Sequence, residues 1–196
     1  TSPYAYCMNN PVNNIDPDGK KIVLANGSTP SFIENYNYTV NFLREKGCSY
    51  FIDKLEASKH IYTIRESHNS LNYFDWTLRE ISWASTMGLI TPYTILSPAT
   101  ILNHEFDHAV QFEDNPMLFK ENIKILDDNN EHADYHTEED YRVINGSERK
   151  TAEKLGEIEI GGKTRNGHSG IPIRTKNSIS NEPLNKLEEF IIEKDK

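Results

Sequence analysis

The chain has 196 residues, of which 36% are hydrophobic and 26% charged, with a formal net charge of −9. This length suits one domain with its own core, and ten Tyr, eight Phe and two Trp supply side chains to bury, which argues against a disordered chain. No stretch approaches the roughly 20 apolar residues that cross a bilayer, and the acidic charge disfavours a domain that grips nucleic acid by its phosphates.

The first nineteen residues differ in composition from the rest. From Tyr4 to Gly19 the chain is dense in Asn, Pro, Asp and Gly, which predicts a turn-rich lead-in. The chain starts at Thr1 rather than at Met and lacks the layout of a signal peptide, so we expect a fragment of a longer protein. Cys7 and Cys48 are too few for a disulfide scaffold, and we interpret them as unlinked thiols.

The next segment predicts two strands around a helical region. Residues 21–25 form a short apolar run, and residues 60–65 alternate and are β-branched, so both are expected to be strands. Residues 30–57 carry apolar side chains at helical spacing, and Gly47 is expected to break or kink that helix. The candidate core residues of this helix are Phe32, Tyr36, Val40, Phe42, Leu43, Phe51 and Leu55.

A third strand is expected at residues 75–83, after a turn at residues 67–72. Its alternation predicts a set of inward side chains, with the two tryptophans in the core. That set is Trp76, Leu78 and either Ile81 or Trp83. Residues 87–96 have a mixed pattern that leaves helix and strand open.

A helix is expected to begin at Ser97 and Pro98 and to run to about Phe112. Ser can cap the free amides of a first turn, and Pro at the first helical position sacrifices no hydrogen bond. Residues 113–116 are expected to end this helix.

The rest of the chain predicts shorter helices separated by polar loops. Helices are expected at residues 117–126, 147–155 and 182–194, the second of them stopped by Gly156. The acidic segment 127–140 is expected to be an exposed loop that leads into structure.

The helix expected from Ser97 carries a His-Glu-x-x-His motif at His104, Glu105 and His108. On a helix the two histidines lie one turn apart on the same face, so both imidazoles can reach one metal ion. Zinc held in this way keeps a position open for water, and Glu105 would act as the general base that takes the water's proton. The apolar residues Leu102, Phe106 and Ala109 lie toward the other side of the helix and can be buried.

The third zinc ligand is expected to follow the motif. We favour Glu139, because the gap after His108 is long enough for the chain to loop back. Asp114 has the spacing of metallopeptidases with a nearby third ligand, but Gln111 stands where those proteins need a turn-making Gly. The alternatives that stay open are Glu138, Asp114, His132 and His136.

A hydrogen-bond donor is also expected near the metal, because peptide hydrolysis develops an oxyanion. The candidates are Tyr141, Arg142 and His168. Arg142 has the alternative role of pairing with a carboxylate. His168 lies in a Gly-rich segment that could fold over the cleft.

The lead-in resembles the end of the core domain of RHS/YD-repeat proteins. The resemblance lies in the Tyr-x-Tyr, Asn-Asn-Pro and Asp-Pro-x-Gly elements between Tyr4 and Gly19. In that family a variable C-terminal toxin follows this junction. The resemblance implies delivery by a bacterial secretion system and a cognate immunity protein, with residues 1–19 as the end of the repeat core and residues 20–196 as the toxin domain.

The rest of the chain resembles metallopeptidase toxins related to the type III secreted zinc effectors. The matching pieces are residues 97–109, 138–144, 148–156 and Arg165-x-x-His168. In that family a Glu of the second piece looks like the distant zinc ligand, which supports Glu139. The resemblance implies a zincin-like fold, in which a strand beside the catalytic helix pairs with extended substrate; residues 75–83 are the candidate.

These observations predict an α+β, zincin-like domain with a short sheet and an active-site helix. It is expected to be a zinc endopeptidase that cleaves proteins inside a target cell, without binding nucleic acid or inserting into a membrane. A metal-dependent nuclease toxin and a non-catalytic module with a vestigial metal site are the alternatives.

Overall fold

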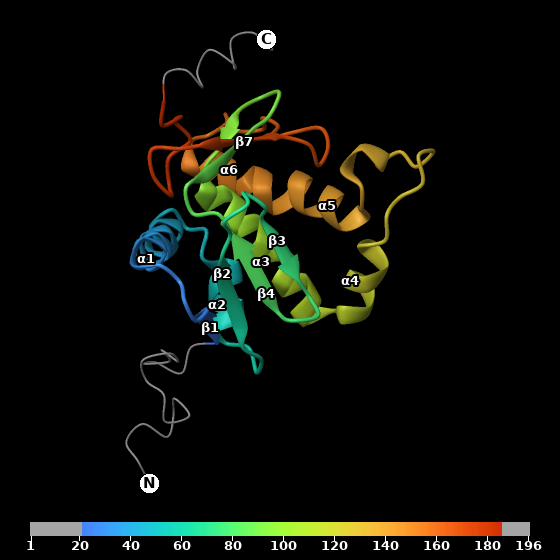
Figure 1. The fold of residues 1–196 in the computed structure, drawn as a ribbon. Helices are drawn as coiled ribbons and strands as arrows, with labels where there is room; N and C mark the ends of the chain where they lie inside the picture. The colour runs from blue at the N-terminus through green and yellow to red at the C-terminus, as the bar shows by residue number, and fades with distance from the viewer. Residues whose placement is uncertain (1–20, 186–196) are drawn as a thin grey trace.

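A computed structural model of the chain describes residues 21–185, which fold as a mixture of helices and two small sheets. Figure 1 shows the helix α3 (Pro98–Asp114) in the middle, between a sheet and a run of helices that crosses above it and ends in α6 (Arg149–Leu155). The expected α+β class is confirmed. Within the described range no helix is long and apolar enough to cross a membrane.

The larger sheet contains the strands β1 (Ile22–Leu24), β2 (Tyr62–Glu66), β4 (Glu80–Trp83) and β3 (Tyr73–Asp75), in that order. The first three strands run parallel and β3 pairs antiparallel with β4 at the edge. The strands expected at residues 21–25 and 60–65 are therefore confirmed.

The strand expected at residues 75–83 is instead a hairpin. The carboxylate of Asp75 accepts hydrogen bonds from the amides of Thr77 and Leu78, which stabilises a turn between β3 and β4. Leu78 lies in this turn and is 66% exposed, so its expected inward position is wrong. Trp83 is fully buried, whereas Trp76 is half-buried against the ring of Phe112.

The helical region before β2 divides as expected at Gly47, which adopts a φ of 68°. Helix α1 (Pro30–Glu45) begins at the capping side chain of Thr29, and α2 (Tyr50–Glu56) follows the break. Their buried side chains pack with the sheet and with α3 into the main core. Those from the two helices are Phe32, Tyr36, Val40, Leu43, Ile52 and Leu55.

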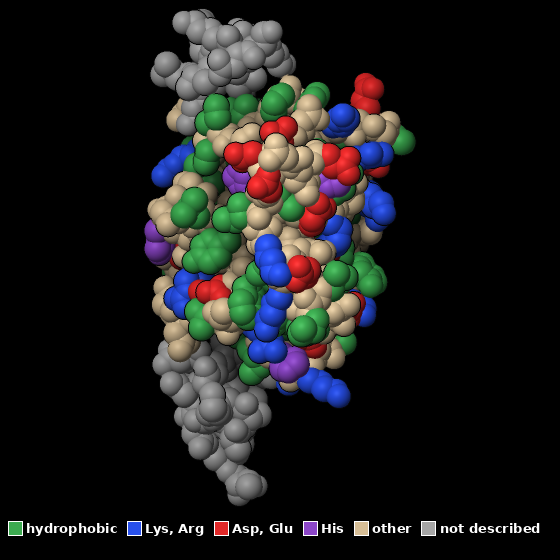
Figure 2. Space-filling model, turned by 90° about the vertical axis from the view of Figure 1, so that its right-hand side faces the viewer, with side chains coloured by type: hydrophobic (Ala, Val, Ile, Leu, Met, Phe, Trp, Pro, Cys, Tyr) green, Lys and Arg blue, Asp and Glu red, His purple; other side chains and the backbone are tan. Residues whose placement is uncertain are grey.

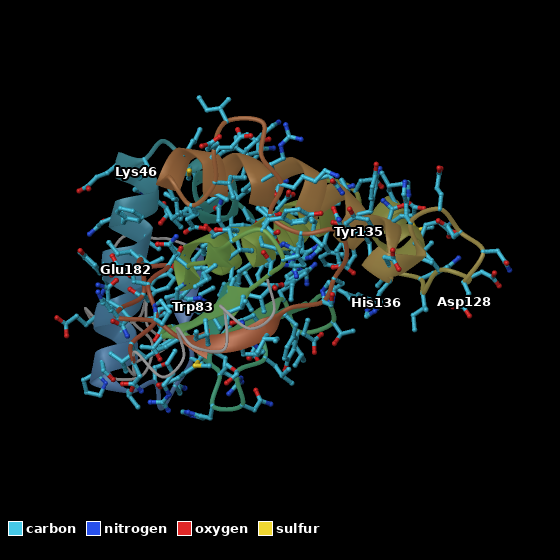
Figure 3. All side chains as sticks on the ribbon, turned by 90° about the horizontal axis from the view of Figure 1, so that it is seen from above. Lys46, Trp83, Asp128, Tyr135, His136 and Glu182 are labelled. Carbon is cyan, nitrogen blue, oxygen red and sulfur yellow. The ribbon has the colours of Figure 1, made fainter. Side chains whose placement is uncertain are left out.

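Helix α3 begins where the sequence predicts. The Ser97 side chain accepts a hydrogen bond from the Thr100 amide, and Pro98 occupies the first helical position. The indole N–H of Trp83 donates to the Pro98 carbonyl at 2.9 Å, which ties the helix start to β4. Figure 3 shows Trp83 beside this end of α3.

A second helical layer follows α3. It contains α4 (Pro116–Asn122), a short 3₁₀ turn (Ala133–Tyr135), and then one continuous stretch made of α5 (Glu138–Val143), a π-helical turn (Ile144–Glu148) and α6. Gly156 ends α6 with a left-handed φ of 77°, as expected. The expected loop at residues 127–140 therefore ends at the start of α5.

A second sheet joins β6 (Ile95–Leu96), β5 (Met87–Ile90) and β7 (Ile171–Arg174), all antiparallel. Gly88 is required here, because a Cβ at this position would lie 2.5 Å from the carbonyl oxygen of Leu96. Strand β7 was not predicted, since its segment is polar and Gly-rich. The lead-in 1–19 and Cys7 lie outside the described residues, as does most of the expected helix 182–194; residues 182–185 are not helical, and Cys48 is a buried free thiol.

Candidate metal centre

His104 and His108 lie on the face of α3 that turns away from the apolar core, and both are buried. Their Nε2 atoms are 3.0 Å apart. The carboxylate of Asp140 on α5 completes the group, with Oδ1 3.6 Å from His108 Nε2 and all three donor atoms within 4.8 Å of one another. These three side chains could hold a metal ion.

The opposite ring nitrogens of the two histidines each face a buried carboxylate. Nδ1 of His104 is 2.8 Å from Glu148 Oε2, and Nδ1 of His108 is 3.2 Å from Glu139 Oε1. A carboxylate accepts a hydrogen bond from an Nδ1–H and so leaves the Nε2 lone pair free for a metal. Both carboxylates are 1% exposed.

An arginine binds each of these carboxylates. Arg165 donates from Nε to Glu148 Oε1 at 3.1 Å and from Nη2 to Oε2. Arg142 donates to both oxygens of Glu139, at 2.6 and 3.1 Å. The buried carboxylates are therefore paired charges rather than isolated ones, which offsets part of their desolvation cost.

The electrostatic setting favours ionised carboxylates around the histidines. Burial alone would raise the pKa of Glu148, but the charge of Arg165 and the contact with His104 hold it at about 2. Burial opposes a charge on His108, yet its contacts with Asp140 and Glu139 raise its pKa to about 10. Contact with His108 likewise lowers the pKa of Asp140 despite its burial. The centre is thus built to hold positive charge.

Glu105 differs from the other acidic groups around the centre. It is 6% exposed, and no hydrogen bond among residues 21–185 holds its carboxylate. Burial raises its pKa, and the neighbouring His104 and His108 oppose that rise. A buried carboxylate without a hydrogen-bond partner, beside two histidines, is free to accept a proton.

The carboxylate that joins the two histidines differs from the one that the sequence favours. Glu139 lies behind His108, on Nδ1, while Asp140 lies on the Nε2 side. Consecutive residues of a helix point about 100° apart, so the rotation of α5 about its own axis decides which of the two faces the centre. Glu138 contacts His132.

The remaining alternatives lie away from the donor atoms. Asp114 pairs with Lys54 at the far end of α3, with 3.2 Å between the charged atoms. His132 stacks on Tyr141 with the ring centroids 3.5 Å apart. The His136 ring is exposed and lies 5.3 Å from the ring of His168.

Of the three predicted oxyanion donors, the structure brings His168 to the centre. Its Nε2 is 3.4 Å from Asp140 Oδ1, and its side chain is 43% exposed. Tyr141 stacks on His132, and Arg142 binds Glu139 and Asp107, so its alternative role as a partner of carboxylates is the one observed.

A cavity of about 670 Å³ opens beside His168. It is lined by Pro92, Asp128, Ala133, Asp134, His136, Arg165, Asn166, Gly167 and Ser169. Figure 3 shows Tyr135, His136 and Asp128 at the end of the molecule opposite α1, and Figure 2 shows acidic side chains gathered in the upper half of the face on that side. Of its lining residues, Arg165 also contacts the centre, through the carboxylate of Glu148.

Several residues of the centre are not indicated by the sequence pattern. Asp107 lies inside the motif and accepts hydrogen bonds from Arg142 and Ser147, while Glu148 and Arg165 contact each other although they are 17 residues apart. The segments that contain Glu148 and Arg165 belong to the resembling pieces, but neither residue stands out by its local pattern.

No family model, no curated protein and no solved structure matches the chain.

Proposed function

We propose that this chain is a zinc-dependent endopeptidase domain that acts as a secreted bacterial toxin or effector on proteins of a target cell. The observation that supports it most is the buried, unbonded Glu105 beside two histidines whose Nε2 atoms converge. A metal site that served structure alone would need no such free carboxylate.

The donor set fits zinc. Two neutral imidazoles and one carboxylate form a ligand set that zinc takes at catalytic sites, and three protein ligands leave a position open. His104, His108 and Asp140 would hold it, and the Nδ1 contacts with Glu148 and Glu139 would orient the rings. When bound, zinc would polarise the scissile carbonyl and make water more acidic.

Different side chains of this centre would then act in different steps of peptide hydrolysis. Glu105 would accept the proton of the attacking water and pass it to the leaving amine. His168 would donate a hydrogen bond to the oxygen on which negative charge develops. The free edge of β3, which borders α3, could pair with an extended peptide backbone.

The general-base role predicts a large loss of activity from Glu105→Gln. Removing a general base costs about 10²–10⁴-fold in rate, while zinc content should stay at the level of the wild-type chain. The measurement is peptide cleavage with the metal content of the same sample, and growth of cells that express each form. A variant that remains fully active and toxic would rule out this mechanism.

The ligand role of Asp140 is tested against Glu139 with isosteric substitutions. Glu139→Gln removes an outer contact and should weaken zinc binding about 10–100-fold. Asp140→Asn removes a direct ligand and should weaken it further. Competition with a chelator gives both dissociation constants, and the reverse order would return the ligand role to Glu139.

The toxin context is proposed from the resemblance of residues 4–19 to the RHS junction. It implies delivery by a secretion system, action inside the target cell and a cognate immunity protein that neutralises the domain. Coexpression of a neighbouring open reading frame with the toxic chain tests this part, and rescue of growth is the expected result.

A further inference from the structure

We infer that Glu148 and Arg165 form a positioning pair. Glu148 fixes the tautomer and orientation of the His104 imidazole, and the guanidinium of Arg165, which binds Glu148, also holds the backbone of His168 in place. This inference rests on the proposed function, because it assigns roles to residues around the same centre. Glu139 and Arg142 form a second pair of this kind, but among the described residues this pair contacts His108 and no other histidine.

The π-helical turn is what brings Glu148 to His104. Glu139 and Glu148 are nine residues apart, so in a regular α-helix they would point in nearly opposite directions, at about 100° per residue. The turn Ile144–Glu148 winds the chain less per residue, which rotates Glu148 toward the face that carries Glu139. Both carboxylates consequently reach α3 from one helical stretch.

Arg165 connects the helical stretch that carries Glu148 to the segment that carries His168. Its Nε and Nη2 bind the Glu148 carboxylate, and its Nη1 donates to the carbonyl oxygen of His168 at 3.1 Å. The His168 amide in turn donates to the Asp134 carbonyl at 3.0 Å. The segment with His168 is thus attached to the centre through one buried guanidinium, and Arg165 is 7% exposed.

The pair around His108 has the same chemistry but a different third contact. Arg142 binds Glu139 and then Asp107, which belongs to α3 itself. Within residues 21–185, Arg142 makes no hydrogen bond to a loop. Losing Glu139 should therefore disturb His108 and leave His168 in place, whereas losing Glu148 should disturb both His104 and His168.

The first experiment compares Glu148→Gln with Glu139→Gln in the metal-free chain. Imidazole ¹⁵N shifts, recorded where the rings are neutral, report which ring nitrogen carries the proton. In the wild-type chain His104 should be protonated at Nδ1, and Glu148→Gln should shift it toward the Nε2–H form. The matched Glu139→Gln variant should shift only His108.

The second experiment follows the amide of His168 by hydrogen exchange. Arg165→Lys keeps a positive charge beside Glu148 but loses the fork that also reaches the His168 carbonyl. This variant should retain the His104 tautomer, because Glu148 keeps a positively charged neighbour, yet its His168 amide should exchange at least ~10-fold faster. Glu139→Gln should leave that exchange rate unchanged.

Glu148→Gln leaves Arg165 buried without its partner and so risks unfolding. The double variant Glu148→Gln/Arg165→Gln removes both charges and should show the same tautomer change with zinc binding weakened about 10–100-fold. An unchanged His104 tautomer in the folded double variant, or equal His168 exchange in the Glu139 and Arg165 variants, would overturn the inference. These readouts need no substrate, so a chain that gives the expected results but cleaves no peptide would refute only the proposed peptidase activity.

Discussion

The two faces of α3 pack against different kinds of side chain. One face packs into the main core through apolar side chains, and the other packs against α5, the π turn and α6 through ionised and hydrogen-bonded groups. The apolar contributors are Ala99, Leu102, Phe106, Ala109 and Val110. Both faces are equally buried, so burial by itself does not separate structural from functional residues.

Stability and chemistry come from different faces of α3. Removing apolar surface from water stabilises the fold by about 25 cal/mol per Å², whereas buried ion pairs offset their desolvation cost only when every partner is present. The apolar face therefore holds the helix in place. The charged face presents His104, Glu105 and His108 in a fixed geometry at little or no gain in stability.

The largest effect on stability is expected from Phe106→Ala on the apolar face. Phe106 is fully buried, and truncating a buried Phe costs about 3–5 kcal/mol. Urea unfolding of the metal-free chain measures it. The exposed Leu78→Ala serves as control and should stay within about 0.5 kcal/mol of wild type; a similarly small effect at Phe106 would mean that this face does not hold the helix.

A pH-dependent effect is expected from Glu157, which lies against the start of α3. Its carboxylate accepts from the Ser97 amide at 3.2 Å and from the Thr100 hydroxyl at 2.8 Å, but burial raises its pKa to about 7. A raised carboxyl pKa gives stability that is complete below the unfolded value near 4.5 and is lost as the pH rises through 7.

Glu157→Gln should remove this pH dependence. Relative to the variant, the wild-type free energy of unfolding should fall between pH 4.5 and 7 by up to about 3 kcal/mol and change little above that range. Denaturant melts across this range measure the difference, with the exposed Glu159→Gln as control. Parallel curves for wild type and Glu157→Gln would contradict the prediction.

The smallest effect is expected at the N-cap that serves both faces of the helix. Ser97→Ala removes the acceptor for the Thr100 amide and should cost about 1 kcal/mol. Ser97→Gly loses the same hydrogen bond but should cost only a few tenths of a kcal/mol, since Gly is tolerated at an N-cap. Thermal melts compare both variants with the wild-type chain, and a Ser97→Ala variant that melts like wild type would show that the cap hydrogen bond does not stabilise the helix start.

The fold was predictable where local patterns are strong. Ser97 and Pro98 indicate the start of α3, Gly47 indicates the break between α1 and α2, and Gly156 indicates the end of α6. The prediction failed between Tyr73 and Trp83, because an alternating pattern continues across a turn that the Asp75 side chain stabilises. It also missed β7, whose strand forms only because β5 offers it a partner.

The candidate site was predictable only in part for the same reason. His104, Glu105 and His108 lie within one turn of a helix, so their relative positions follow from helix geometry. Glu139 and Asp140 are neighbours in a helix whose orientation relative to α3 is set by packing. A rotation of one residue exchanges their roles, and no local pattern contains that rotation.

Local sequence is enough to place α3, its apolar face and the convergence of two imidazoles, because contacts between residues four apart depend on backbone periodicity alone. Packing between distant segments makes Asp140 face the histidines, brings Glu148 and Arg165 to His104, and places His168 within 3.4 Å of Asp140. The contacts of Glu148 with His104 and with Arg165 join residues that are 44 and 17 positions apart in the sequence. They exist only because the core, the π turn and the loops bring these segments together.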